Sequence, residues 1–344
     1  MSSSLPPSSS SPGPVRRPEI VSPEIVSVVV ATPVAGCFDY IVAEHLSVVA
    51  GSVVMVPFGN RRLPGIVLGP GSGDVAVEKL RCLEDVSDVP ALPAALIPFM
   101  QRFADWTLSP LGAVAKMILS QPAALAPAAL QKRFFRPESL PAKQRMTPAR
   151  QRVLGALADG AHLTAKDLSV AADASPAVIA AMAAQGLLGV DHVAQDQPPA
   201  VPRCDLPGLT LTATQATAAA ELSAMIGQGF ATTLLDGVTG SGKTEVYFEA
   251  VKTAVQAGQQ VLILLPEIAL SAAWRSRFAA RFGVSPVEWH SDVSAAQKRR
   301  AWRFALTGQL SVVVGARSAL FLPFQNLGLI IVDEEHEHAF KQED

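Results

Sequence analysis

The chain has 344 residues, enough for two or three domains, and its 49% apolar content supplies ample material for packed cores. A net charge of −2 does not mark a nucleic-acid binder, although a local basic patch could be hidden in that total. Three widely spaced cysteines, Cys37, Cys82 and Cys204, lack the C-x-x-C pairing of a zinc site and favour a reducing compartment. No apolar run reaches the length of a membrane span. We therefore expect a soluble, cytoplasmic protein with no membrane contact.

The first 120 residues divide into a leader and a small β-rich unit. Residues 1–23 are rich in serine and proline without an apolar core, which predicts a disordered leader rather than a signal peptide. Short β-like segments separated by turn signals then predict a β-rich domain over 24–120, with a more helical part at 92–119. The predicted strands are 25–30, 38–42, 51–56 and 63–68.

The middle of the chain predicts a helical domain between two linkers. We expect linkers at 121–145 and 195–207, where prolines are frequent. Thr147 followed by Pro148 predicts a helix start, and further helices are expected at 165–171 and from 176 to 186. Three short helices over 146–194 fit a winged-helix domain, and a plain three-helix linker domain fits the same pattern.

From residue 208 onward strands and helices alternate, which predicts a parallel sheet covered on both faces. Gly258 and Gly283 are expected to end two of the helices, and Ser294 with Gln297 has the spacing of a capping box for a third. The predicted helices are 244–257, 267–282 and 294–306, and the predicted strands are 232–235, 261–265, 286–289, 311–314 and 327–332.

A phosphate-binding loop is the strongest motif in the chain. Residues 237–244 match G-x-x-x-x-G-K-[ST] at every position, between a strand-like run and a helix-like run. Backbone N–H groups of such a loop surround a phosphate chain, Lys243 reaches the terminal phosphates, and the Thr244 hydroxyl binds Mg²⁺. A chance glycine turn is the alternative. The expected loop residues are Gly237, Val238, Thr239, Gly240, Ser241, Gly242, Lys243 and Thr244.

Consecutive carboxylates follow the predicted strand 327–332, 90 residues after Lys243. In phosphate-loop enzymes the first such acid holds Mg²⁺ and the next polarises the attacking water. This predicts that Asp333 binds the metal and that Glu334 is the general base, with Lys243 completing the catalytic set. An acidic surface turn is the alternative.

Four segments together resemble the PriA family, the primosomal replication-restart helicases of bacteria within superfamily 2. They are 237–247, 265–268, 315–319 and 333–336, the last reading Asp-Glu-Glu-His, and the resemblance extends from about Val26 to the last residue. It implies a multidomain α/β protein: a DNA-end-binding domain, a winged helix, and over 208–344 a RecA-like helicase lobe cut after its second box. The activity implied is that of an ATP-dependent 3′→5′ DNA helicase that recognises stalled or abandoned replication forks and initiates primosome assembly.

The resemblance also implies a pocket for the 3′ end of a nascent strand. The matching positions are Phe38, Asp39, Tyr40 and Gly59, with Arg81 where the family usually has lysine. A carboxylate can accept a bond from a terminal hydroxyl, and aromatic side chains can stack on a base. The alternative is that Phe38 and Tyr40 are strand core residues and Asp39 is solvated.

Further contacts follow from the same resemblance. Gln215 matches the glutamine that reads adenine, which implies ATP as the nucleotide; its alternative is a surface helix residue. Arg317 and Ser318 are expected to contact the DNA backbone, although Ala316 stands where threonine is more usual. Six more basic residues could widen this surface or lie on solvated helix faces: Arg275, Arg277, Arg281, Lys298, Arg299 and Arg300.

The implied cofactors are ATP and Mg²⁺, while the family's zinc-binding cysteines and second helicase lobe lie beyond Asp344. The implied partners are forked DNA with a nascent 3′ end, other primosome proteins, single-stranded-DNA-binding protein and the replicative helicase. We therefore expect an N-terminal fragment that binds fork DNA, binds ATP weakly and hydrolyses little of it. A non-catalytic fork-binding and loader scaffold, with nucleotide as a switch, and an unrelated phosphate-loop ATPase stay open as alternatives.

Overall fold

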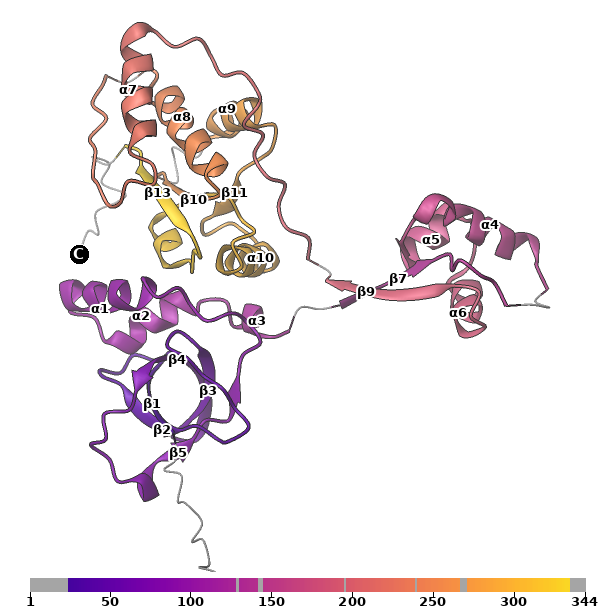
Figure 1. Cartoon of the computed structure of the whole chain (residues 1–344), viewed down its shortest axis with the longest axis horizontal. Helices are drawn as coiled ribbons and strands as arrows, with labels where there is room; N and C mark the ends of the chain where they lie inside the picture. Colours follow the sequence, from indigo (N-terminus) through magenta and orange to yellow (C-terminus); the bar gives the residue numbers. More distant parts are fainter. Residues whose placement is uncertain are drawn as a thin grey trace, which may run out of the picture.

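The computed structural model describes residues 24–127, 130–141, 145–194, 196–238, 240–266 and 271–334. Figure 1 shows three parts: a β-rich unit, a helical unit carried on a two-stranded ribbon, and a layered unit of helices around a sheet. The expected leader, Thr239 of the phosphate loop, and the motif residues from Glu335 onward lie outside the described residues.

The β-rich unit is a curved sheet of six strands in the order β5-β2-β1-β4-β3-β6, which Figure 1 shows curling around its own core. Buried valines that alternate along the strands fill this core together with Tyr40 and Leu83. The four predicted strands are confirmed, although β3 lies two residues later than expected and β4 extends two residues further at each end. The six strands are β1 (Ile25–Val30), β2 (Phe38–Ile41), β3 (Val53–Phe58), β4 (Arg61–Pro70), β5 (Arg81–Cys82) and β6 (Asp85–Val86).

Two helices, α1 (Leu96–Thr107) and α2 (Leu111–Ile118), confirm the helical character expected at 92–119. Helix α2 approaches the end of β1 so closely that a Cβ on Gly112 would lie 2.1 Å from the Thr32 carbonyl oxygen. Only glycine fits there. The short helix α3 (Pro122–Leu125) follows.

The helical unit combines three helices with a small antiparallel sheet of order β8-β7-β9. The threonine cap is confirmed, because the Thr147 hydroxyl accepts a bond from the Arg150 N–H. The segment expected as the linker 121–145 differs: it contains α3 and, at its middle, strand β7, which pairs with β9. Its elements are β7 (Leu130–Phe135), α4 (Pro148–Ala156), η2 (Ala158–Gly160), β8 (Leu163–Thr164), α5 (Ala165–Ala171), α6 (Pro176–Ala184) and β9 (Gly189–Ala194).

The third unit is the expected parallel sheet, in the order β11-β12-β10-β13. One face packs against α8 and α9 and the other against α10 and η3, as Figure 1 shows. The capping box of Ser294 and Gln297 is confirmed. The elements are α7 (Ala213–Ala224), α8 (Lys243–Gln256), β10 (Gln260–Leu264), α9 (Ala272–Phe282), β11 (Val287–Trp289), α10 (Ala295–Leu306), β12 (Val312–Gly315), η3 (Arg317–Phe321) and β13 (Leu327–Val332).

The strand predicted at 232–235 is wrong: residues 230–238 contain no strand. Phe230 is 99% exposed and Leu234 is 79% exposed, so most of this apolar run is not buried. Strand β13 is an unpaired edge of the described sheet, with Ile330 47% exposed. A strand forms only where a neighbouring strand satisfies its backbone groups, and residues 230–238 do not reach that edge.

Within the described residues no single helix is long and apolar enough to cross a membrane. Helices α5 and α6 pass that test only when taken together, and the chain bends by 113° between them.

Candidate nucleotide site and DNA-contacting surfaces

The phosphate loop leads directly into helix α8, as the motif requires. Gly242 caps the helix with a φ of +85°, and a Cβ there would lie 2.5 Å from the Gln215 side-chain nitrogen. The backbone turn and the close neighbour both demand glycine. Lys243 begins the helix, and its ammonium donates to the Gly237 carbonyl oxygen at 2.5 Å. The lysine therefore folds back over its own loop at the helix N-terminus, where an anion is favoured.

Gln215 joins helix α7 to this loop. Its amide oxygen accepts a bond from the Thr212 N–H at 2.8 Å and forms a capping box. Its amide nitrogen donates to the Ser241 carbonyl oxygen at 2.8 Å. The residue expected to read adenine thus lies beside the phosphate loop, with both ends of its amide engaged by the chain.

Asp333 and Glu334 follow β13, on the same side of the sheet as the phosphate loop. One Asp333 oxygen accepts a bond from the Tyr247 hydroxyl at 3.0 Å, and the other accepts from the Glu334 N–H at 3.0 Å. Glu334 has a φ of +53°, an uncommon conformation for a residue other than glycine, asparagine or aspartate. Strained backbone of this kind clusters at functional sites.

Tyr247 is a site residue that sequence reasoning did not single out. It lies one helical turn after Lys243 and is 5% exposed. Its hydroxyl accepts a bond from the Trp274 indole N–H at 2.9 Å while it donates to Asp333. Burial raises the pKa of this phenol well above its usual value, and the adjacent Asp333 carboxylate raises it further. The hydroxyl is therefore a permanent donor. The only signal in the sequence was its position at i+4 from Lys243, which places it on the same helix face.

The oxygen donors around Tyr247 fit Mg²⁺. The Thr244 hydroxyl also lies within hydrogen-bonding reach of the Tyr247 hydroxyl, so Thr244 and Asp333 converge on one point. A hydroxyl and a carboxylate, completed by phosphate oxygens and water, are the ligands that Mg²⁺ takes at such sites. When bound, the ion would neutralise charge on the terminal phosphates.

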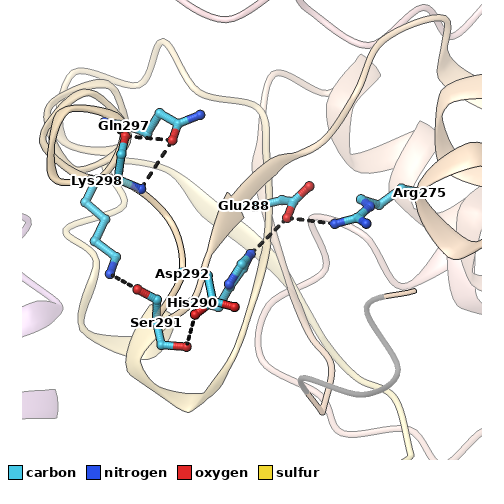
Figure 2. A network of polar contacts seen from close by, with 8 residues as sticks. Arg275, Glu288, His290, Ser291, Asp292, Gln297 and Lys298 are labelled. Atoms are coloured by element: carbon cyan, nitrogen blue, oxygen red, sulfur yellow. Dashed lines mark hydrogen bonds and ion pairs between the residues drawn. The ribbon is translucent and has the colours of Figure 1, made fainter. Parts of the chain in front are cut away.

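Arg317 and Ser318 lie where strand β12 ends, on the first turn of η3, and both are exposed. The neighbouring strand β11 ends beside them, because the Ala316 N–H donates to the Trp289 carbonyl oxygen at 3.1 Å. The turn after β11 carries the polar network drawn in Figure 2, in which Glu288 accepts from His290 and from Arg275. The ends of β11 and β12 therefore form one polar edge.

The further basic residues mostly engage acidic partners or backbone oxygens. Arg275, Arg277 and Arg281 form ion pairs with Glu288, Glu245 and Glu249. Lys298 donates to the Ser291 carbonyl oxygen, as Figure 2 shows, and Arg299 pairs with Asp196. The expectation of solvated helix faces is wrong for Arg281, which is 5% exposed.

The expected DNA-end residues lie on β2, on the neighbouring strand β5 and in the turn between β3 and β4 of the β-rich unit. The Phe38 ring contacts Phe58 edge-on at 5.1 Å. Tyr40 is buried and donates to the Pro57 carbonyl oxygen at 3.2 Å, so it belongs to the core. These contacts leave the choice between pocket and core residue open for Phe38.

Gly59 and Arg81 are joined, because the guanidinium donates to the Gly59 carbonyl oxygen at 3.0 Å. The Asp39 side chain lies on the opposite face of β2 from those of Phe38 and Tyr40, because successive side chains of a strand point to alternate faces of the sheet. Its Oδ2 accepts bonds from the Ser72 N–H and hydroxyl, both at 2.8 Å. The Ser72 hydroxyl thus already forms a hydrogen bond to the Asp39 carboxylate, which was expected to accept one from the terminal hydroxyl of the DNA strand.

Comparisons with known proteins agree with this division of the chain. Residues 27–120 match the family model of the PriA 3′ DNA-binding domain, and residues 212–344 match that of the DEAD/DEAH box helicases. The first matched segment contains the candidate DNA-end residues, and the second contains the candidate nucleotide-site residues together with Arg317 and Ser318.

The chain is also similar to curated proteins named replication restart protein PriA. The protein of Haemophilus influenzae is 33% identical over 93% of this chain and 45% of its own length. That of Rickettsia typhi is 56% identical over 33% of this chain and 17% of its own length, and that of Synechocystis sp. is 40% identical over 53% and 22%. The chain thus spans less than half the length of these relatives. Matches to both family models and to these relatives show that the chain is similar to the corresponding part of replication restart proteins named PriA, over both its DNA-binding and its helicase segment.

Proposed function

We propose that this chain carries the fork-recognising and first motor parts of an ATP-dependent 3′→5′ DNA helicase that initiates primosome assembly at stalled or abandoned forks. The observation that carries the proposal is the convergence of the phosphate loop and the Asp333–Glu334 pair, bridged by Tyr247. The two family models support it, because a DNA-binding domain and a helicase domain occur in one chain.

In this function Lys243 leaves the Gly237 carbonyl oxygen and binds the terminal phosphates instead. Thr244 and Asp333 hold Mg²⁺, and Glu334 accepts a proton from the attacking water. Gln215 reads the adenine edge of ATP, which requires that its amide exchange the Thr212 and Ser241 contacts for the base. The loop residues Gly237 to Gly242 supply backbone donors.

The DNA contacts divide between two regions. Phe38, Asp39, Gly59 and Arg81 bind the 3′ end of the nascent strand, with Tyr40 supporting them from the core. Arg317 and Ser318 contact the sugar-phosphate backbone at the motor. We propose that the unit over 146–194 is a winged helix, and its three helices with the small sheet β8-β7-β9 support this over a plain three-helix linker.

The partners that we propose are forked DNA, other primosome proteins, single-stranded-DNA-binding protein and the replicative helicase. They rest on the family alone. We propose the domain limits 24–120, 146–194 and 208–344 on the same basis, with β7 assigned to the middle unit.

The test uses forked DNA whose unwinding requires translocation in one direction, with the complete protein. Wild-type protein is expected to unwind the 3′→5′ substrate with ATP and Mg²⁺. Lys243→Ala is expected to weaken triphosphate binding about 10- to 100-fold, because it removes hydrogen bonds to charged groups. Glu334→Gln should keep ATP binding and lose hydrolysis. Unwinding that survives both substitutions would contradict the proposal.

A second candidate is a fork-binding scaffold in which nucleotide acts as a switch. It is favoured by residues 230–238, which enter the phosphate loop without joining the sheet and leave it without support on that side. On this candidate, Lys243→Ala abolishes nucleotide-dependent changes in fork affinity, and ATP turnover is negligible in the wild type as well. Turnover stimulated by forked DNA and lost in Lys243→Ala would exclude the scaffold.

A further inference from the structure

Trp274 lies in the first turn of helix α9 and is 6% exposed. The Ser271 hydroxyl caps this helix and accepts a bond from the Trp274 backbone N–H at 3.3 Å. The indole ring stacks on Phe278 at 5.6 Å and contacts Phe248 of α8 edge-on at 5.9 Å. Because close-packed aromatic rings on two sides fix the direction of the indole, its N–H is aimed at one point. That point is the Tyr247 hydroxyl, whose oxygen is 2.9 Å from the indole nitrogen.

The direction of the hydrogen bonds through Tyr247 is fixed at both ends. An indole N–H can only donate, so the phenol oxygen accepts from Trp274 with one lone pair. An ionised carboxylate can only accept, so the phenol proton is donated to Asp333, at 3.0 Å. A phenol has one proton and two lone pairs, and its second lone pair can only accept. The Thr244 hydroxyl, which lies within hydrogen-bonding reach, is therefore the donor in its contact with Tyr247.

These bonds orient the two side chains that we expect to bind the metal. Because Thr244 directs its proton at Tyr247, the lone pairs of its oxygen are left for a cation. Asp333 is held at both carboxylate oxygens, by the Tyr247 hydroxyl and by the Glu334 N–H, each at 3.0 Å. Each oxygen keeps a further lone pair, because a carboxylate offers about four acceptor positions. The chain thus presents oriented oxygen donors of the kind that Mg²⁺ binds.

We propose that Trp274 is a positioning residue of the nucleotide site, which acts through Tyr247 on the two metal ligands. Without the indole donor the phenol can turn, and its proton is no longer committed to Asp333. The inference deepens the proposed function and rests on it, because it takes Thr244 and Asp333 to bind Mg²⁺. Trp274 is 27 residues from Tyr247 and lies outside the phosphate loop and the acidic motif.

The experiment measures the affinity of the chain for a fluorescent ATP analogue at a series of Mg²⁺ concentrations and, separately, in EDTA. Trp274→Phe keeps an aromatic ring and loses the indole donor. It should raise the Mg²⁺ concentration at half-saturation about threefold, the size expected for one weakened hydrogen bond. Affinity in EDTA should stay unchanged, because no metal is then involved. An equal loss of affinity with Mg²⁺ and in EDTA would mean that Trp274 acts through packing, and it would overturn the inference.

A double variant tests whether Trp274 acts through Tyr247. Tyr247→Phe alone is expected to raise the Mg²⁺ requirement about fivefold. Adding Trp274→Phe should raise it no further, because the indole then has no hydroxyl to orient. Independent effects would instead multiply to about fifteenfold, which would refute the relay. If Trp274→Phe does not fold, Trp274→Met replaces it with the same expectations, since the flexible methionine side chain is apolar and also lacks the donor.

The matched control is Trp302→Phe. Trp302 is fully buried on the opposite face of the sheet, and its indole N–H donates to the Ile118 carbonyl oxygen at 2.8 Å. The control variant loses the same kind of bond, so it should lower the melting temperature and leave the Mg²⁺ requirement unchanged. A Mg²⁺ shift equal to that of Trp274→Phe would show that both substitutions act through stability alone.

Asp333→Asn separates failure of this inference from failure of the proposed metal site. The substitution removes the carboxylate charge, and it should raise the Mg²⁺ requirement at least about tenfold. If Asp333→Asn leaves the requirement unchanged, Asp333 does not bind the metal, and the proposed site is wrong together with the inference. If Asp333→Asn raises the requirement while Trp274→Phe does not, the metal site stands and the positioning role of Trp274 is refuted.

Discussion

The face of the helicase sheet that packs on α10 and the edge formed by β13 differ in how completely they are covered. On one side α10 and η3 pack against the β-rich unit, and Trp302 is fully buried there. On the other side β13 is an unpaired edge among the described strands, and the run that enters the phosphate loop is exposed. The difference teaches that the side packed by α10 and η3 is built as a fixed frame, whereas the edge beside Asp333 and the phosphate loop keeps strand surface with no strand partner among the described residues.

One buried side chain joins the end of α10 and the segment before β12 to the central strand β10. Gln260 begins β10, is 2% exposed, and donates from its amide nitrogen to the Ala305 and Leu310 carbonyl oxygens. Its amide oxygen accepts from the Asn326 N–H at 2.8 Å. A buried amide with these partners satisfied fixes neighbouring loops in a single arrangement.

The largest expected effect concerns the covered side. Trp302→Ala removes a fully buried aromatic residue and should cost about 3–5 kcal/mol of unfolding free energy. Trp106→Ala is the matched control, because Trp106 is 79% exposed, and it should change stability by less than about 1 kcal/mol. Urea unfolding monitored by circular dichroism measures both. Equal losses would remove the contrast between a packed frame and an exposed surface.

A smaller loss of unfolding free energy is expected from isoleucine-to-alanine substitutions in the adjacent strands β10 and β13. Ile263→Ala in β10 removes a fully buried side chain and should cost about 2–5 kcal/mol. Ile330→Ala in β13 removes one that is 47% exposed and should cost about 1 kcal/mol. The same unfolding assay compares them. A cost for Ile330→Ala that matches Ile263→Ala would mean that the β13 edge is covered in solution.

The smallest effect is expected from a substitution beside Asp333, directly after β13. Tyr247→Phe removes the bond to Asp333 and the acceptor of the Trp274 indole N–H and leaves the ring in place, so it should cost about 1–2 kcal/mol. It should also raise the Mg²⁺ concentration needed for nucleotide binding about fivefold, since Asp333 loses its orientation. A fluorescent ATP analogue titrated at several Mg²⁺ concentrations measures this.

The chain's other tyrosine provides the control for that substitution. Tyr40→Phe removes the bond from a buried hydroxyl to the Pro57 carbonyl oxygen in the β-rich unit. It should cost a similar amount of stability without changing the Mg²⁺ requirement. An identical Mg²⁺ shift in both variants would show that Tyr247 acts through stability alone.

Local signals predicted much of this fold. The glycine loop before α8, the strand 327–332 before Asp333 and the Ser294 capping box all rest on neighbours in sequence, and each was predicted at or near its place. The parallel sheet followed from the alternation of strands and helices.

What escaped prediction depends on distant parts of the chain. The run 232–235 has strand-like composition, but strand formation needs a partner that composition does not reveal. Strand β7 was hidden because only one of its six residues is buried and two are charged, and it exists through its pairing with β9. The Tyr247–Asp333 bond joins residues 86 positions apart, and sequence periodicity carries no information about it.

The uncovered β13 edge has a consequence for the handling of this protein at high concentration. The strand reads Leu-Gly-Leu-Ile-Ile-Val, without charge or proline, and its backbone groups on one side have no strand partner among the described residues. Such a segment is a template for pairing with the same segment of another molecule. A charged residue at Ile330 should therefore suppress concentration-dependent association, and light scattering of Ile330→Lys beside the wild type measures how strongly this edge governs colloidal behaviour.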